Sequence, residues 1–259
     1  MPETTAPRLE LSQVTLIALS SVHVEATVKA LQSSSHHIDF AAVKLVTDKT
    51  AVSVPDDITV VSIDPLASAR DYSAFVLSRL ADLFETSHCL LVQWDGYAIR
   101  PVAWRAEFLD CDYIGARWPH FVDEKNVGNG GFSLRSRALA EACRSPEFHP
   151  SHPEDLAICR KNREWLESEG LRFTAPELAD AFSTERAGSL DHSFGFHGVW
   201  HMPRVLGNEA FFDLYQRLDE RSSVWHDFAL LLRLLSRGKG GLRRAIRLTC
   251  DWLVTRVRD

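Results

Sequence analysis

The stretch CLLVQWDG, residues 89–96, runs from four apolar residues directly into polar residues and ends at a glycine. Apolar residues on both faces are typical of an interior strand in a sheet that is covered on both sides. Gly96 breaks the strand, so Asp95 is predicted at its carboxyl end, the edge where open α/β sheets bind ligands. A carboxylate there either meets a positive partner such as a divalent cation or accepts backbone N–H groups in a turn. Both interpretations stay open on this stretch alone.

The residues before this stretch alternate between strand and helix patterns. Strands are expected over 14–19, 40–46 and 59–63, and helices over 22–32 and 71–84. This order predicts an α/β fold with a mostly parallel mixed sheet flanked by helices. Ser20 and Ser21 follow the first strand, and the helix that begins there can receive an anion at its N-terminus.

The length of 259 residues fits one large domain with an appendage. We expect a flexible tail over 1–12, a domain over 13–207 and a basic helical appendage over 208–259. The net charge of -6 argues against a protein built to grip nucleic acid. Five cysteines without a CxxC pair argue against a disulfide framework or a structural zinc site.

Three further polar islands interrupt apolar sequence: GNGGFSLRS at 128–136, PEDLAICR at 153–160 and FGFHGVW at 194–200. Glycines in the first island permit close approach of the backbone to a ligand, and they also suit a plain turn. In the second island, Glu154 and Asp155 fall in the first turn of a helix, as catalytic carboxylates or as caps. In the third, His197 lies among aromatic residues, as a ligand or as an ordinary core histidine.

One reaction gives each island a role, namely the transfer of a sugar from a nucleotide-diphosphate donor. Asp95 would bind Mg²⁺ or Mn²⁺ through oxygen, and the cation would neutralise charge on the departing diphosphate. His197 would be a second metal ligand or a hydrogen-bond donor to the diphosphate. Asp155, or Glu154 beside it, would be the general base that removes the proton of the acceptor hydroxyl.

The four islands, together with DYIGARW at 112–118, resemble a bacterial domain family of unknown function that is linked to surface-polysaccharide biosynthesis. The resemblance covers roughly Leu11–Gly207. It implies a GT-A type glycosyltransferase, with a Rossmann-type sheet and a nucleotide-sugar donor. One alternative is a degenerate GT-A domain that binds a sugar or nucleotide but catalyses no reaction. A third hypothesis, which the sequence favours least, is a nucleotidyltransferase.

The island order is also similar to that of the fringe-like β-1,3-glycosyltransferases. On that likeness, Asp95 corresponds to their metal-binding aspartate, and Gly130 and Gly131 correspond to their glycine-rich stretch. Asp155 corresponds to their catalytic base, and His197 corresponds to the histidine that comes late in their sequence. The likeness is incomplete, because the usual metal motif DxD has an acid where this chain has Gln93. Metal binding is therefore expected to be weak or replaced by basic groups.

The resemblance implies an inverting hexosyltransferase that acts on a saccharide or lipid-linked acceptor in O-antigen or capsule biosynthesis. The residues expected to contact the donor lie on several elements of the predicted domain. They are Ser20, Ser21 and Tyr72 for the nucleotide, Lys44, Arg135 and Arg137 for the diphosphate, and Gln93, Trp94, Asp95, Gly130 and Gly131 around both. For Tyr72, packing on its own helix face is an equal alternative.

The C-terminal segment 224–257 mixes apolar residues with arginines at helical spacing. This pattern suits docking on an anionic inner leaflet, and so predicts a cytoplasmic protein that is peripheral on the inner membrane. The alternatives are that these helices pack on the domain or form a homodimer interface. The acidic, polar N-terminus is not typical of a signal peptide.

Overall fold

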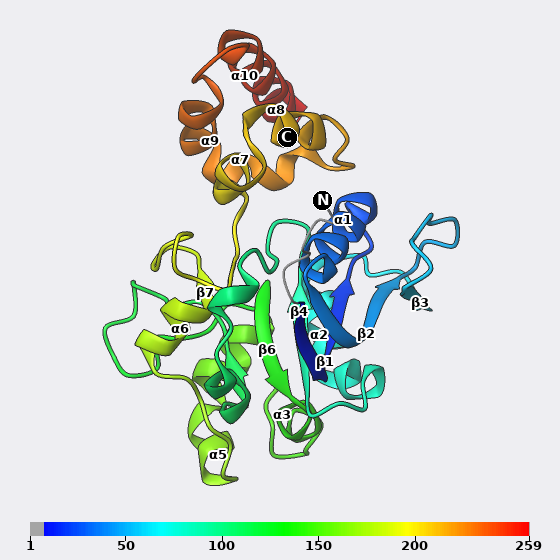
Figure 1. The fold of residues 1–259 in the computed structure, drawn as a ribbon, viewed down its shortest axis with the longest axis vertical. Coiled ribbons are helices and arrows are strands. Elements are labelled where there is room, and N and C mark those ends of the chain that lie inside the picture. Colours follow the sequence, from blue (N-terminus) through cyan, green and yellow to red (C-terminus); the bar gives the residue numbers. More distant parts are fainter. Residues whose placement is uncertain (1–7, 259) are drawn as a thin grey trace, which may run out of the picture. The chain divides into compact units, whose positions relative to one another are not determined.

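The computed structural model describes residues 8–258, which fall into two compact units, Met1–His197 and Gly198–Asp259 (Figure 1). The first seven residues of the expected tail lie outside the described part. Leu9 already begins the first strand, so the ordered domain starts earlier than residue 13. The division between the units follows His197, whereas the sequence suggested a division after Gly207.

The first unit is built on a six-stranded sheet in the order β3-β2-β1-β4-β6-β5. Of these strands, β6 is antiparallel to its neighbours and the other pairings are parallel. This confirms the predicted α/β fold with a mixed, mostly parallel sheet. The strands are β1 (Leu9–Leu19), β2 (Ile38–Thr47), β3 (Ile58–Ser62), β4 (His88–Val92), β5 (Tyr113–Ile114) and β6 (Phe132–Ser136).

Strand β4 is buried along its whole length, as the apolar run predicted. It pairs with β1 in the register Leu16–Leu90, Ile17–Leu91 and Ala18–Val92. One face of the sheet is covered by α2 (Ala69–Arg79), the turn Leu80–Leu83 and α3 (Arg137–Ala142). Helix α1 (Val24–Ser35) packs on β1, β2 and β4 (Figure 1).

The remainder of the first unit is made of short elements. Apolar residues at helical spacing predict one helix over 156–169, but the structure divides this region into α4 (Glu154–Leu156), a π-helical turn (Ala157–Lys161) and α5 (Arg163–Ser168). The sequence also predicts a strand over 171–175, and the structure has only one bridge there, between Phe173 and Tyr113. The remaining elements are short helical turns over Pro101–Ala103 and Ala106–Asp110, α6 (Pro176–Phe182), β7 (Ser183–Thr184) and β8 (Gly195–Phe196).

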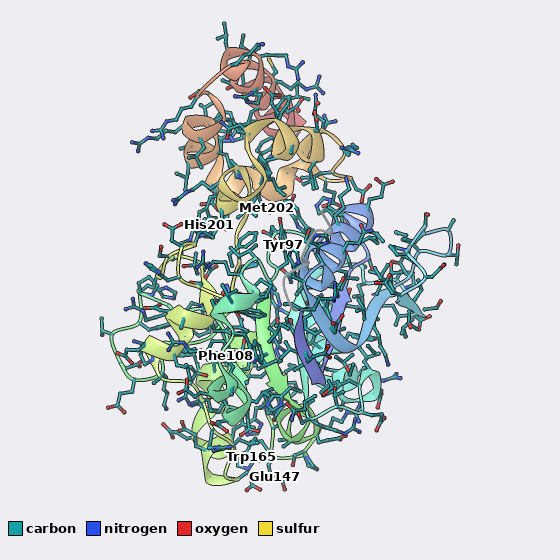
Figure 2. The ribbon with its side chains drawn as sticks, viewed as in Figure 1. Tyr97, Phe108, Glu147, Trp165, His201 and Met202 are labelled. Carbon is teal, nitrogen blue, oxygen red and sulfur yellow. The ribbon has the colours of Figure 1, made fainter. Side chains whose placement is uncertain are left out.

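Aromatic side chains hold these short elements together. Phe108, labelled in Figure 2, is fully buried and meets the ring of Phe182 edge to face, with the ring centroids 5.2 Å apart. Tyr97, also labelled there, meets Phe196 in the same way at 4.8 Å. The aromatic island around residue 196 therefore belongs to the core that supports the end of β4.

The second unit is helical, as predicted for the appendage. Its core is formed by apolar side chains of three helices, among them Phe211, Tyr215, Leu231 and Leu248. None of the helices described in either unit is long and apolar enough to cross a membrane. The elements are short turns over Val199–His201 and Arg221–Asp227, α7 (Met202–Leu206), α8 (Asn208–Gln216), α9 (Phe228–Leu235) and α10 (Gly241–Arg258).

Candidate functional site

The QWDG stretch forms a tight turn directly after β4. Gln93 and Gly96 exchange two backbone hydrogen bonds of 3.0 Å, so that Trp94 and Asp95 occupy the turn. Because β1 and β4 are parallel neighbours, this turn and Ser20 lie at the same edge of the sheet. From β1 the chain continues to β2 on one side, and it returns through α2 to β4 on the other. The turn therefore marks the switch point of the sheet, where α/β folds bind ligands.

The imidazole of His197 is surrounded by polar side chains from separate parts of the first unit. Its Nε2 lies 3.3 Å from Oε1 of Gln93 and 3.7 Å from Oδ1 of Asp95. Its Nδ1 lies 3.4 Å from Oε1 of Glu185 and 2.9 Å from Nδ2 of Asn129. We call these five residues the His197 cluster. It unites the QWDG stretch at 93–96 with the islands at 128–136 and 194–200.

The glycines of this region make room for side chains of the protein itself. A Cβ atom on Gly131 would lie well inside van der Waals distance of Nε2 of His197, and one on Gly96 would lie 2.8 Å from its Cδ2. A Cβ on Gly130 would collide with Oε1 of Glu154. The space left by the missing side chains was predicted to admit a ligand, but in the structure it is occupied by His197 and Glu154.

Burial alone lowers the pKa of His197, but the carboxylates of Asp95 and Glu185 outweigh it and raise the pKa to about 9. Burial raises the pKa of Asp95, and the neighbouring His197 partly offsets this. Burial also opposes ionisation of Glu185, yet hydrogen bonds from His197 and Asn129 lower its pKa. The two acidic side chains therefore favour the protonated form of the His197 ring.

Asn129 fixes the orientation of this cluster. Its Oδ1 accepts hydrogen bonds from the backbone N–H groups of Gly131 at 3.0 Å and Phe132 at 3.4 Å. The amide nitrogen is thereby turned toward His197 and Glu185. Asn129 adopts a positive φ of 70°, a conformation that asparagine tolerates better than most residues.

A metal held jointly by Asp95 and His197 does not fit this arrangement. Beside Nε2 of His197, the side chains are the carboxylate of Asp95 and the neutral amide of Gln93, so one carboxylate alone would meet the cation there. Within residues 8–258, no group of three or more His, Cys, Asp or Glu side chains is placed to hold a metal ion. The side-chain oxygen supplied by Gln93 adds no charge that would favour a cation.

Glu154 is part of a buried ion pair. Its Oε1 lies 3.1 Å from Nη2 of Arg135, and its Oε2 accepts a hydrogen bond of 3.1 Å from Ser73. The exposed fraction is 5% for Glu154 and 1% for Arg135. Neither side chain is accessible to a substrate, so the roles predicted for them as base and diphosphate ligand lack structural support.

Asp155 is half-buried beside this pair. Its Oδ2 accepts the backbone N–H of Gly130 at 3.2 Å, and its Oδ1 accepts that of Leu156 at 2.8 Å. Burial and the charge of Glu154 raise the pKa of Asp155, which increases its basicity. The charge of Asp155 also helps to raise the pKa of His197. Asp155 therefore acts electrostatically on His197, which also lies beside Asp95.

The expected nucleotide contacts lie around the same edge. Tyr72 forms a side-chain hydrogen bond with Gln93, and burial raises the pKa of its phenol. Trp94 meets the ring of His23 edge to face at 5.3 Å. The hydroxyl of Ser21 accepts the N–H of Leu66 at 3.2 Å. Ser20 donates its hydroxyl to the carbonyl oxygen of Val22.

Two predicted cations lie elsewhere. Nζ of Lys44 donates a hydrogen bond of 2.6 Å to the carbonyl oxygen of Leu83, in the turn that precedes β4. Arg137 donates to the carbonyl oxygen of Phe84 in the same region. Because these carbonyls precede β4 and the QWDG turn follows it, the structure does not bring Lys44 or Arg137 into the His197 cluster.

Comparison with known proteins gives one family match. The model of the family described as Protein of unknown function (DUF5672) matches residues 57–197. The match contains all four islands except the end of the last one, and it ends at His197, the last residue of the first unit. No curated protein matches the chain.

Several solved structures are similar to this chain over much of its length. The mannosyltransferase PcManGT from Pyrobaculum calidifontis, in complex with GDP-Man and Mn²⁺, is 13% identical, with a TM-score of 0.41, over 98% of this chain and 79% of that one. The glycosyltransferase GlyE of Streptococcus pneumoniae TIGR4 is 9% identical, with a TM-score of 0.43, over 83% and 64%. TarS 1–349 of S. aureus, in complex with UDP-GlcNAc, is 11% identical, with a TM-score of 0.35, over 92% and 80%.

The family match is the firmer of these two results, because it concerns sequence and spans 141 of the 259 residues. It includes the turn after β4, the glycine loop, the acidic pair and His197. This chain belongs to the DUF5672 family of proteins of unknown function.

Proposed function

We propose that this protein is a glycosyltransferase that moves a sugar from a nucleotide-diphosphate donor to a hydroxyl group of a saccharide or lipid-linked acceptor. The observation that carries the proposal is the convergence of four distant polar segments at one edge of the sheet. The turn after β4, the loop before β6, the start of α4 and the residue after β8 all contribute side chains there.

The donor nucleotide is proposed to lie over Ser20 and Ser21, at the end of β1. Helix α1 begins at Val24, so its N-terminus faces the same edge and favours the negative charge of a diphosphate. Trp94 is proposed to offer aromatic surface to the base, whereas Tyr72 packs against the core of the sheet and forms a hydrogen bond with Gln93. The sugar then extends from the diphosphate toward Asp155.

The proposed reaction is a single displacement. The acceptor oxygen attacks the anomeric carbon, and the bond from that carbon to the diphosphate oxygen breaks with its electron pair on the leaving group. The acceptor proton passes to Asp155, whose raised pKa makes it a stronger base than an ordinary aspartate. A base on the face opposite the leaving group gives inversion.

His197 is proposed to donate a hydrogen bond to the departing diphosphate. Asp95 and Glu185 keep the imidazole protonated, and Asn129 fixes the loop on which it packs. A charged donor of this kind stabilises negative charge that grows in the transition state. No step passes through Mg²⁺ or Mn²⁺, and the assay below measures the effect of added Mn²⁺.

The test is a nucleotide-release assay with UDP-, GDP- and dTDP-sugars, with and without Mn²⁺. If Asp155 is the base, Asp155→Asn should lower the rate on the order of 10²-fold or more. The exposed Asp213 in α8 provides a matched control, and Asp213→Asn should leave the rate unchanged. Near-normal turnover by Asp155→Asn would remove the assignment of the base.

A second candidate function is a sugar- or nucleotide-binding module without catalysis. It is favoured by Gln93 in place of an acid and by the backbone hydrogen bonds that both oxygens of Asp155 accept. This candidate predicts that a nucleotide raises the melting temperature while no donor is turned over. The catalytic proposal predicts both stabilisation and release.

The motif resemblance further supports a place in bacterial surface-polysaccharide assembly, with O-antigen or capsule intermediates as acceptors. In that setting the protein acts on the cytoplasmic side of the inner membrane. Product analysis with lipid-linked and with free saccharide acceptors tests this part. Transfer to neither class, despite donor hydrolysis, would contradict it.

A further inference from the structure

Helix α10 leaves large apolar side chains on the surface of the second unit. The exposed fractions are 75% for Leu242, 54% for Ile246, and 50% each for Leu253 and Val254. Soluble surfaces commonly carry single exposed apolar residues, but several along one helix indicate a surface that is covered by something else.

Three of these residues occupy one side of the helix. At about 100° per residue, Leu242, Ile246 and Leu253 fall within an arc of about 40°. The opposite side packs on its own unit, because Arg244 and Leu248 are buried and Trp252 stacks on Phe228 of α9 with the ring centroids 4.6 Å apart. We call the exposed residues Leu242, Ile246 and Leu253 the α10 face; Val254 lies about 120° from Leu242, between Arg243 and Arg247.

Arginines border the α10 face on both sides. By the same helical geometry, Arg243 and Arg247 follow it on one side and Arg256 on the other, and all three are exposed. Arg256 lies over the ring of Trp252 at 4.2 Å from its centroid. Long arginine side chains can keep their charge in water while neighbouring apolar groups enter a less polar medium.

Helices α9 and α10 and the loop between them are strongly basic. Residues 228–256 contain seven Lys or Arg residues and one acid, Asp251. Asp251 is ion-paired with Arg221 at 3.3 Å and with Arg247 at 3.1 Å, and Arg244 is buried against Glu209. The six exposed cations are Arg233, Arg237, Lys239, Arg243, Arg247 and Arg256.

We propose that the α10 face docks on an anionic lipid membrane, with its apolar residues at the acyl boundary and the flanking arginines on the headgroups. An apolar strip bordered by cations is complementary to such a surface. A second copy presenting the same face would bring the three bordering arginines of each copy close together, which disfavours self-association through it. The inference rests on the second unit and is independent of the proposed reaction.

The first test is vesicle flotation of the full chain. Vesicles of phosphatidylcholine alone are compared with vesicles that also contain phosphatidylglycerol. We expect flotation with the anionic vesicles only, and a weaker association at high salt, since screening removes the electrostatic part. This comparison needs no variant and is unaffected by folding defects.

The second test separates the apolar and charged parts. Leu242→Ser/Ile246→Ser should abolish flotation, and Arg243→Gln/Arg247→Gln should weaken it by about 25-fold, at roughly fivefold per neutralised arginine. Val102→Ser and Val122→Ser are matched controls, because these valines are 89% and 101% exposed in the first unit. Unchanged melting temperatures show that the variants fold.

Three outcomes would overturn the proposal. The first is the absence of wild-type flotation with anionic vesicles. The second is equal flotation of wild type and both α10 variants. The third is a concentration-dependent dimer of the wild type that Leu242→Ser/Ile246→Ser converts to monomer, because the face would then join two copies of the chain.

Discussion

Gly131 and His197 are in direct contact, and the contact exists because residue 131 has no side chain. A Cβ atom there would occupy the space of the imidazole Nε2, and Gly96 borders the same ring from another segment. The backbone of the glycine loop and the imidazole are therefore fitted to each other, which places Nε2 beside Gln93 and Asp95.

Gly131→Ala should displace His197 and lower nucleotide release on the order of 10²-fold, the cost of a misplacement of about 1 Å at a reacting centre. The control is a double-mutant cycle, since His197→Ala removes the ring with which the new methyl group collides. Gly131→Ala should then have little further effect. Equal effects of Gly131→Ala in both backgrounds would show that the contact is irrelevant to activity.

The raised pKa of His197 predicts a specific dependence of stability on pH. The folded-state pKa of about 9 lies above the unfolded value of about 6.5, so folding favours the protonated form. The resulting stabilisation is fully present below about pH 6.5 and is lost as the pH rises through 9. It should amount to on the order of 3 kcal/mol.

Urea unfolding of wild type and His197→Gln at several pH values measures the stabilisation that comes from the protonation of His197. The difference in unfolding free energy between the two proteins should shrink between pH 6.5 and 9. A difference that is constant over this range would contradict the imidazolium between Asp95 and Glu185.

Glu185→Gln should lower the pKa of His197, because it removes one of the two carboxylates that favour the protonated ring. NMR titration of the imidazole protons reports this pKa directly. Glu177→Gln, an exposed acid at the start of α6, is the matched control and should leave the titration unchanged. An unaltered pKa in Glu185→Gln would mean that Glu185 does not face the ring in solution.

The ion pair between Arg135 and Glu154 predicts an asymmetric response to mutation. Arg135→Met should destabilise the protein by about 3–5 kcal/mol, because it leaves the buried carboxylate of Glu154 without its cation. Arg135→Met/Glu154→Leu should recover most of this loss, since neither charge remains buried. Urea denaturation of the two variants provides the measurement, and a double variant as unstable as the single one would contradict this account of the pair.

The fold was predictable from the sequence where local pattern decides it. The apolar run before Gln93 and the alternation of strands and helices before it led to the sheet, and the strand-ending glycine placed Asp95 at the ligand-binding edge. Short elements were less predictable. The apolar spacing of 156–169 suggested one helix, but a π-helical turn divides it, and apolar spacing alone does not reveal such a turn.

The partners of individual side chains could not be predicted in the same way. Lys44 and Arg137 were expected to face a diphosphate. Their side chains instead donate hydrogen bonds to the carbonyl groups of Leu83 and Phe84, which lie at the other end of β4. Glu185 gave no signal, because it lies in a polar loop and meets His197 only through the tertiary fold. Asn129 had a weak signal, since an asparagine between two glycines suits a positive φ.

The central claim is that the cluster around His197 and the nearby Asp155 form one sugar-transfer site. Nucleotide release from a panel of UDP-, GDP- and dTDP-sugars, measured for wild type, His197→Ala, Asp155→Asn and Asp213→Asn, tests it most directly. The account predicts release from at least one donor by wild type and Asp213→Asn, and a loss on the order of 10²-fold in the other two. Equal release by all four proteins, or release by none from any donor, would contradict it.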